Sequence, residues 1–343
     1  MKKILLLLLL SFRITGFFGQ TYKDSIQYQN LVFEGVGLKG LAYCGALLEM
    51  EERGMMTSIK RVAGTSSGAI TATFLALGFT PSEVAEIIGS TNFAKFSDGG
   101  GWWFGRLIRL FRRYGIYKGR AITKWMEKLI ASKGLNPDIT FEELEALAKK
   151  NPKYKSLVIT ATCIVHQKAD FFSVHTFPKL RVVDAVRASM TMPLYYEPIA
   201  IDKYGNVCDL RHRSDDDHLY LDGGFLTNYP IKIFDDSTLY DCKPYHTIGF
   251  KMDGDWHVDH DRQKTGPTQF VIRNVFGLGN AGYCIYKEAI YRAYLNQADW
   301  KRTVSIGDCE VGAFVKKLSE EKKMELLESG RKGFKQFMFV GYK

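Results

Sequence analysis

The sequence predicts an α/β protein with a mainly parallel central sheet, and three observations support this fold class. Two short apolar runs, 30–34 and 59–63, each end in a glycine-rich turn that is followed by residues at helical spacing. Strand and helix therefore alternate twice within about fifty residues, which is typical of parallel strands joined by crossover helices. No fixed-period repeat or low-complexity linker divides the 343 residues, so we expect one α/β domain with a C-terminal extension packed on it.

The individual elements follow from spacing and from the residues that end helices. Apolar residues recur at helical spacing over 41–48, and Gly54 then ends the first helix. A second helix is expected over 69–77, ended by Gly78. Further candidates are strands at 157–163, 219–222 and 246–251, a helix at 182–189 and a charged helix at 319–337.

Composition places the chain among ordinary globular proteins. Apolar residues make up 46% of the chain and charged residues 24%, which excludes an intrinsically disordered chain and a disulfide-stapled scaffold. After the N-terminus no window reaches the ~20 apolar residues of a spanning helix, so a polytopic membrane protein is excluded too. The formal net charge of +10 favours an anionic partner.

Residues 1–19 have the order of a secretory signal peptide. Two lysines precede an apolar run at 4–12, and glycines follow it. We therefore expect export to a periplasmic, outer-membrane-associated or secreted location, with the cytoplasm left open. The residues two places before those glycines, Ile14 and Phe17, are too large for a usual cleavage site, so a short N-terminal hydrophobic anchor is the alternative interpretation.

Six cysteines are scattered along the chain without a C-x-x-C pair, at positions 44, 163, 208, 242, 284 and 309. This distribution predicts neither a disulfide framework nor a zinc site. Cys44 and Cys163 fall in apolar surroundings and are expected to be buried thiols of the core.

The segment Gly64-Thr65-Ser66-Ser67-Gly68 matches the G-x-S-x-G nucleophile elbow. A serine on a tight strand-to-helix turn projects its hydroxyl outward, and the flanking glycines leave room for the turn and the substrate. The start of the following helix also favours developing negative charge. Its place between a predicted strand and a predicted helix identifies Ser66 as the candidate nucleophile and Ser67 as a helix-start hydroxyl.

The segment Gly35-Val36-Gly37-Leu38-Lys39-Gly40 has three interpretations. A dinucleotide-binding fingerprint would need an acidic residue at the end of the next strand, but that strand ends in Ala63-Gly64. A glycine turn without a ligand is the second interpretation. In the third, backbone N–H groups form an oxyanion hole for a tetrahedral intermediate. The serine elbow downstream favours the oxyanion hole.

An activated serine needs a base, and Asp222-Gly223-Gly224 supplies a carboxylate after an apolar stretch. A carboxylate in a partly desolvated pocket takes the serine proton directly if its pKa is raised. Taken alone, Asp-Gly-Gly is more often a turn. None of the seven histidines stands in a catalytic context. A Ser66–Asp222–His246 triad is one alternative, and a catalytically silent lipid- or nucleotide-binding module is another.

Together these segments resemble the patatin-like phospholipases, a family with a G-x-G-x-[KR]-G loop, a G-x-S-x-G elbow and a D-G-[GA] segment. The three motifs occur here in that order, at 35–40, 64–68 and 222–224. The segment 186–193, Tyr196-Glu-Pro198 and the pair Asn228 and Pro230 are also similar to family segments. The resemblance covers residues 29–235.

This resemblance implies a three-layer α/β fold and hydrolysis of fatty-acyl esters, as in a phospholipase A or lysophospholipase. It implies that Ser66 is the nucleophile, that Asp222 is the base of a dyad without histidine, and that the backbone near Gly37 and Leu38 forms the oxyanion hole. No metal or other cofactor is required. The chain then divides into a signal peptide (1–19), a catalytic domain (29–235) and a C-terminal α/β extension (236–343).

One departure from the family is the long segment 202–218 before the aspartate strand. Its acidic run at 215–217 lacks the ligand spacing and the glycine of an EF-hand. We expect a solvated surface loop there.

Residues 102–117 combine aromatic, aliphatic and basic side chains. On a helix, one side would carry Trp103, Leu107, Leu110 and Tyr114, and another would carry Arg106, Arg109 and Arg113. This is typical of an interfacial helix on anionic lipid, and equally of an amphipathic core helix with a solvated basic side. Four arginines occur here and Lys118 follows directly, without an acid among them, so much of the positive excess is local. No nucleic-acid-binding motif accompanies them, and a lipid surface is the expected partner.

Overall fold

The computed structural model describes residues 26–99, 103–214, 217–253, 272, 275–311 and 317–339. The predicted signal peptide 1–19, residue 102 and two residues of the acidic run, 215 and 216, lie outside the described residues.

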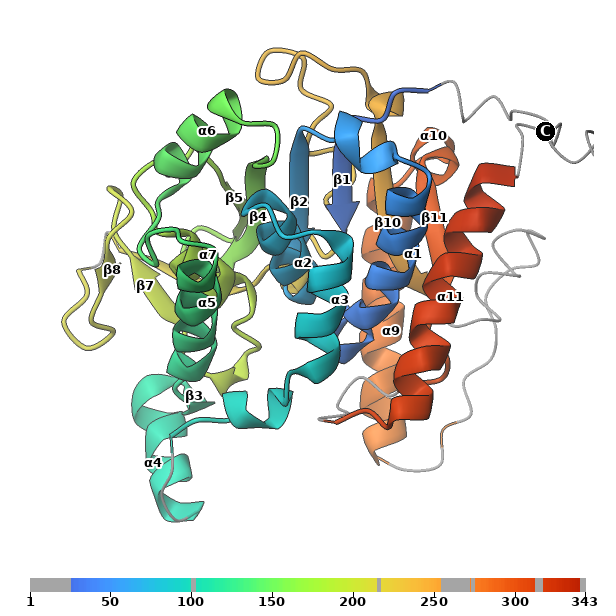
Figure 1. Ribbon diagram of the computed structural model, residues 1–343. Helices are drawn as coiled ribbons and strands as arrows, with labels where there is room; N and C mark the ends of the chain where they lie inside the picture. Colours follow the sequence, from blue (N-terminus) through green and yellow to red (C-terminus); the bar gives the residue numbers. More distant parts are fainter. Residues whose placement is uncertain are drawn as a thin grey trace, which may run out of the picture.

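In this part of the chain a nine-stranded sheet forms the centre of the molecule (Figure 1). Its strands lie in the order β11 (Thr303–Gly307), β10 (Thr247–Asp253), β1 (Asn30–Phe33), β2 (Arg61–Thr65), β4 (Ser156–Cys163), β9 (His218–Asp222), β7 (Ile199–Ile201) and β8 (Val207–Cys208), and β5 (Lys168–Phe172) also pairs with β4. The strands from β11 to β4 are parallel to one another. Antiparallel pairs join β4 to β9 and β5, β9 to β7, and β7 to β8. The predicted α/β class with a mainly parallel sheet is confirmed.

Helices and loops cover both faces of the sheet and make three layers. One core unites the alternate β1 residues Leu31 and Phe33 with α1 (Leu41–Glu52), α2 (Ser67–Ala76), α7 (Val182–Ser189) and α11 (Glu320–Phe339). On the opposite face, Val32 and its neighbours pack against the segment 229–240 and against Tyr291 of α9 (Val275–Tyr294). Side chains alternate between the two faces of a strand, so β1 contributes to both cores.

The remaining helices surround this centre. They are α3 (Pro81–Ser90), α5 (Arg120–Ser132), α6 (Phe141–Lys150) and the short α10 (Gln297–Lys301). Helix α4 (Trp103–Arg113) extends away from the body of the molecule at the lower left of Figure 1. It lies beside a small parallel pair of strands, β3 (Gly115–Tyr117) and β6 (Leu194–Tyr196).

The predicted helices and strands are present, and where a strand ends depends on which residues pair with the neighbouring strand. Helix α7 has the predicted bounds, whereas β2 begins and ends two residues later than the predicted 59–63. The reason is that Gly64 and Thr65 pair with Ile159 and Thr160 of β4. Cys44 and Cys163 are fully buried, as predicted.

Residues beyond 235 complete the same sheet. Strand β10 pairs with β1, and β11 pairs with β10 at the edge. Helix α11 packs so closely along α1 that only glycine fits at two contact positions. A Cβ on Gly45 would lie 1.9 Å from the Leu327 carbonyl oxygen, and a Cβ on Gly330 would lie 1.8 Å from the Ala42 carbonyl oxygen. The division at 235 stays a prediction about sequence units, since both parts share one sheet and one core.

Candidate active site

Ser66 lies on the turn between β2 and α2. Its backbone has φ 52° and ψ −119°, a positive φ that non-glycine residues rarely adopt. A strained strand-to-helix turn of this kind is the geometry of a nucleophile elbow. The glycine at 68 permits it, because a Cβ there would lie 2.5 Å from the carbonyl oxygen of Phe33. The same holds for Gly64, whose Cβ would lie 2.3 Å from the carbonyl oxygen of Gly68.

Asp222 reaches Ser66 through the register of the sheet. Thr65 is paired with Thr160 of β4, and the next residue of β4, Ala161, is paired with Asp222 at the end of β9. The Ser66 hydroxyl donates a hydrogen bond to Asp222 Oδ2 at 2.7 Å. The Gly224 N–H donates to Asp222 Oδ1 at 2.8 Å. Sequence analysis named both residues, and the structure brings them together.

The electrostatic setting of Asp222 suits a base. Burial raises the pKa of its carboxyl to about 6, and the hydrogen bonds from Ser66 and Gly224 oppose that rise. At neutral pH the carboxyl is therefore mostly ionised, yet it binds a proton more strongly than an exposed aspartate does. A general base is most effective when its pKa lies near the pH at which the enzyme operates.

The glycine-rich segment lies directly against Ser66. A Cβ on Gly35 would lie 3.1 Å from Ser66 Cβ and 2.5 Å from Asn228 Oδ1, so only glycine fits there. Residues Gly37–Gly40 form a short 3-10 helix that Gly37 enters with φ 61°. The first N–H groups of a helix have no acceptor within it, and in this short helix they are the amides of Gly37 and Leu38.

Two other groups of this segment are already engaged. The Val36 N–H donates to Ser67 Oγ at 3.0 Å, so Ser67 holds the loop in addition to starting α2. The Lys39 ammonium forms an ion pair with Asp308 at 3.0 Å, just beyond β11. The loop is thus fixed to the elbow at one side and to the sheet edge at the other.

Two residues that support the pair were not predicted from sequence, one through its side chain and one through its backbone. Ser189, the last residue of α7, accepts the Ser66 N–H through its Oγ at 2.8 Å. The carbonyl oxygen of Thr191 accepts the Asp222 N–H at 2.8 Å. Both lie in the segment 186–193, which was matched to the family without a role for either residue. The structure shows that this segment contacts both members of the pair.

A buried network beneath the glycine-rich segment was also missed. Glu34 is fully buried and accepts the Met252 N–H at 2.8 Å. Asn228 donates from Nδ2 to Glu34 at 3.1 Å and to the Gly35 carbonyl oxygen at 2.9 Å, and the Tyr291 hydroxyl also donates to Glu34. Asn228, quoted in sequence only as a family-like residue, therefore holds the start of the loop.

The alternative triad with His246 is wrong. Asn30 of β1 is level with both Arg61 and Thr247, so His246 lies at the N-terminal edge of the parallel strands. Ser66 lies beyond the C-terminal end of β2, and at about 3.3 Å per residue the stretch from Arg61 to Ser66 spans more than about 15 Å. His246 therefore cannot reach the serine.

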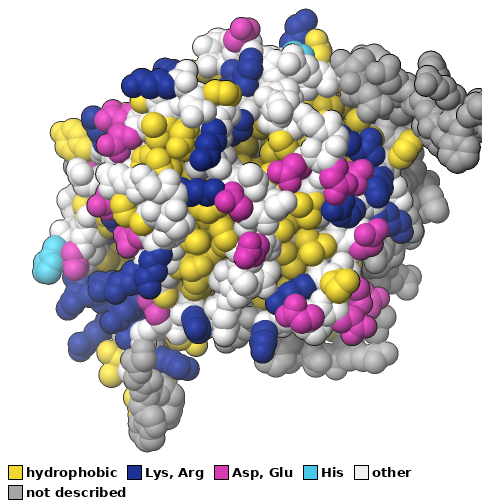
Figure 2. All heavy atoms as spheres, in the orientation of Figure 1, with side chains coloured by type: hydrophobic (Ala, Val, Ile, Leu, Met, Phe, Trp, Pro, Cys, Tyr) yellow, Lys and Arg dark blue, Asp and Glu magenta, His cyan; other side chains and the backbone are white. Residues whose placement is uncertain are grey.

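Helix α4 differs from both sequence interpretations in how its faces are used. Its apolar side chains are exposed, with Phe111 at 79% and Ile108 at 56%, so it is no core helix. Arg109 and Arg113 instead point inward and pair with Glu197 at 3.3 and 3.5 Å. Figure 2 shows Lys and Arg side chains gathered around this lower left part of the molecule. Among the described helices, none is long and apolar enough to cross a membrane.

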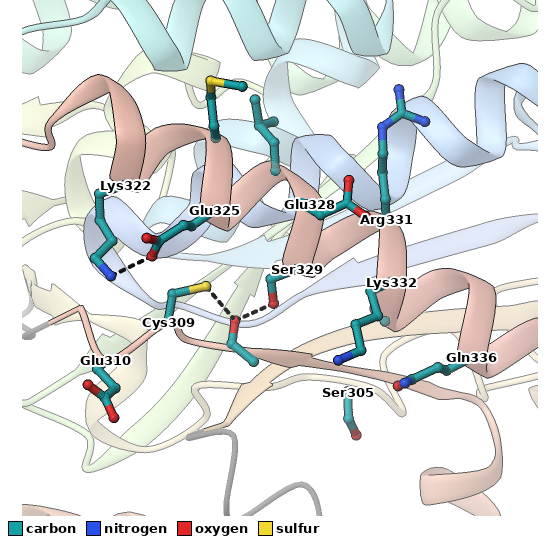
Figure 3. Close-up of a pocket in the computed structure, with 14 residues that line it drawn as sticks. Ser305, Cys309, Glu310, Lys322, Glu325, Glu328, Ser329, Arg331, Lys332 and Gln336 are labelled. Carbon is teal, nitrogen blue, oxygen red and sulfur yellow. Dashed lines mark hydrogen bonds and ion pairs between the residues drawn. The ribbon is translucent and has the colours of Figure 1, made fainter.

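A large groove lies elsewhere, between α11 and the end of β11 (Figure 3). It has a volume of about 990 Å³. Cys309 Sγ and Ser329 Oγ both donate to the Gly307 carbonyl oxygen in it, at 3.9 and 2.7 Å. Its lining includes neither Ser66 nor Asp222, and three strand spacings separate β11 from β2, roughly 14 Å. The groove is therefore not the site of the serine–aspartate pair.

Comparison of the sequence with known proteins identifies the family to which the chain belongs. Residues 31–235 match the family described as "Patatin-like phospholipase". The uncharacterized protein YqhO of Bacillus subtilis is 28% identical over 316 residues, which are 91% of this chain and 98% of YqhO. The "Probable lipid hydrolase 463L" of Invertebrate iridescent virus 6 is 26% identical over 250 residues, or 70% of this chain and 73% of that protein.

Solved structures give the same fold. VipD of Legionella pneumophila aligns with a TM-score of 0.57 at 17% identity, over 91% of this chain and 67% of VipD. The type III effector ExoU of Pseudomonas aeruginosa aligns with a TM-score of 0.50 at 18% identity, over 91% of this chain and 54% of ExoU. At these identities the likeness shows a shared fold.

Proposed function

The chain belongs to the patatin-like phospholipase family and is a lipid ester hydrolase, and from that premise we propose that Ser66 and Asp222 are its catalytic dyad. The observation that carries the proposal is the 2.7 Å hydrogen bond from the Ser66 hydroxyl to Asp222 Oδ2. The raised pKa of that carboxyl supports the same role, because it makes Asp222 a stronger proton acceptor.

The proposed reaction has two halves. Ser66 Oγ attacks the ester carbonyl carbon while its proton moves to Asp222 Oδ2, and the resulting oxyanion accepts hydrogen bonds from the Gly37 and Leu38 amides. Asp222 then returns the proton to the leaving alcohol oxygen as the acyl-enzyme forms. In the second half, water attacks the acyl group, Asp222 accepts its proton, and Ser66 leaves with a proton as the fatty acid is released.

The test is hydrolysis of a mixed lipid extract by the purified protein. Released fatty acids and lyso-products are identified by mass spectrometry, which also separates phospholipid, lysophospholipid, galactolipid and neutral glyceride substrates. We expect Ser66→Ala and Asp222→Asn each to lose turnover, and Ser90→Ala, at an exposed serine of α3, to keep it. Turnover by Ser66→Ala protein would refute the dyad.

Two further measurements address the alternatives. We expect a fluorophosphonate probe to label the wild-type protein but not Ser66→Ala, whereas a silent lipid- or nucleotide-binding module would remain unlabelled. We expect His246→Ala to leave turnover unchanged, because His246 lies at the other edge of the sheet.

We also propose that α4 docks the enzyme on anionic lipid surfaces. Its exposed Phe104, Ile108 and Phe111 supply apolar area, and the exposed Arg106 and Arg112 supply positive charge. The test is co-sedimentation with vesicles that contain or lack anionic phospholipid. We expect Phe111→Ser to weaken binding and Phe339→Ser, at an aromatic residue of α11 that is 64% exposed, to leave it unchanged. Equal binding by the two variants would contradict this role.

A further inference from the structure

A thiol and two imidazoles converge near the end of β4, away from the dyad. Cys163 is the last residue of β4, His166 follows three residues later, and His218 begins β9. One potential ligand atom from each lies within 4.8 Å of the other two. Cys163 is buried, His218 is half-buried and His166 is exposed, so a metal ion could enter from the surface.

The fold itself brings these residues together. Cys163 is paired with Tyr220 across the antiparallel β4–β9 ladder, and His218 lies two residues before Tyr220 on the same face of β9. His166, in the turn between β4 and β5, packs its ring edge-on against His218, with ring centroids 4.5 Å apart. Two strands and a turn thus each supply one side chain.

A second set of contacts fixes the tautomer of His218. The Tyr220 hydroxyl donates a hydrogen bond to Asp170 Oδ2 at 2.8 Å, and it lies 3.0 Å from His218 Nδ1. Since its single proton points to Asp170, the hydroxyl accepts the proton on Nδ1 and leaves Nε2 of His218 with a lone pair. Lys168 also forms an ion pair with Asp170 at 3.0 Å. Metal-binding histidines typically donate their other ring N–H to an oxygen acceptor that fixes the ring, and here the Tyr220 hydroxyl, held by Asp170, is that acceptor.

We propose that Cys163, His166 and His218 bind a divalent transition-metal ion of the zinc type, with Tyr220 and Asp170 orienting His218. One thiolate and two imidazoles suit Zn²⁺ and disfavour Mg²⁺ or Ca²⁺, which prefer oxygen ligands. Three protein ligands leave a fourth tetrahedral position for water.

This proposal departs from the sequence expectation that the cysteines form no zinc site. The chain carries the chelating spacing Cys163-x-x-His166, but the third ligand becomes a neighbour only through the β4–β9 pairing. The site lies on β9 four residues before Asp222, about 13 Å along the strand. The proposal therefore stands independently of the dyad.

The experiment uses the full chain, purified without a histidine tag and stripped with a chelator. Co²⁺ is titrated first, because a Co²⁺–thiolate bond gives a charge-transfer absorption band, and Zn²⁺ is then added as competitor. We expect one equivalent of Co²⁺ to develop this band and Zn²⁺ to displace it. We also expect bound Zn²⁺ to raise the melting temperature.

Variants assign the site to these residues. We expect His166→Ala to weaken Zn²⁺ binding by more than about tenfold, and Tyr220→Phe, which removes only the orienting hydroxyl, to weaken it roughly 10–100-fold. Cys163→Ser should remove the charge-transfer band. His212→Ala, at an exposed histidine beside Asp209, is the matched control and should bind like the wild type.

Two results would overturn the proposal. One is the absence of a thiolate charge-transfer band in the wild-type protein at micromolar Co²⁺. The other is unchanged Zn²⁺ affinity in His166→Ala, which would place any bound metal elsewhere. Because His166 is exposed, its variant tests the site even if Cys163→Ser, at a buried position, fails to fold.

Discussion

Replacing Asp222 by asparagine should abolish hydrolysis and at the same time stabilise the fold at neutral pH. Burial raises the pKa of the Asp222 carboxyl from 3.8 to about 6. A rise of this size corresponds to a cost of at most about 3 kcal/mol for the half-buried anion relative to the unfolded chain. Asparagine removes the charge and keeps both hydrogen bonds, since its Oδ1 accepts from Gly224 and its Nδ2 donates to Ser66 Oγ.

The direction in which stability changes with pH depends on whether the folded or the unfolded chain binds the Asp222 proton more tightly. The folded protein holds the Asp222 proton up to about pH 6, whereas the unfolded chain releases it near 3.8. Wild-type stability therefore falls as pH rises through this window. The asparagine variant has no such group, so its advantage should be absent near pH 4, grow up to pH 6 and stay at no more than about 3 kcal/mol above it.

The assay is urea unfolding of both proteins between pH 4 and 8, with hydrolysis measured on the same samples. The matched control is Asp236→Asn, because Asp236 is exposed and its pKa is lowered by the hydrogen bonds that it accepts from Thr238. This control should keep activity and gain no stability above pH 4. A variant at 222 that is no more stable at pH 8 than at pH 4, relative to wild type, would refute the reasoning about the buried carboxylate.

Three more predictions follow from the same geometry. The acid limb of kcat/KM on a soluble ester should have a pKa of about 6, so that about one tenth of the activity remains at pH 5; a limb near 4 would contradict the role of Asp222 as base. Ser189→Ala leaves the Ser66 N–H without its acceptor, at a cost of about 1–3 kcal/mol, and should lower kcat more than it raises KM; unchanged kcat would show that the elbow does not depend on this bond. Gly330→Ala would place a Cβ 1.8 Å from the Ala42 carbonyl oxygen and should lower the free energy of unfolding by about 1–3 kcal/mol or more, whereas Gly105→Ala in α4, with open space around it, should not.

Local sequence patterns predicted most of the sheet centre, and together with the family resemblance they predicted the Ser66–Asp222 pair that the structure brings together. The reason is that the elbow and the Asp-Gly-Gly segment each have short-range constraints, which glycines satisfy and which a single sequence displays. The end of β2 was misplaced because Gly64 and Thr65 read as a turn, although β4 pairs with them.

The supporting residues were missed because their partners are distant in sequence. Ser189 meets Ser66 across 123 positions, and Asn228 meets Glu34 across 194. In the sequence, Glu34 is only the polar last residue of a predicted strand, and none of its neighbours indicates that its carboxylate is buried. The cluster of Cys163, His166 and His218 was not predicted for the same reason, because His218 is brought beside the other two only by the register of β9 against β4.

The position of β10 between β1 and β11 also affects how the chain folds while it is being synthesised. Thr247 is separated by 217 positions from Asn30, the β1 residue beside which it pairs. A ribosome that adds about 5–20 residues per second needs about 10–45 s to cover that distance. During this time β1 has been synthesised but one of its edges is unpaired, and such edges promote aggregation. Productive folding of this enzyme therefore depends on keeping the nascent chain apart from its neighbours until the last strands emerge.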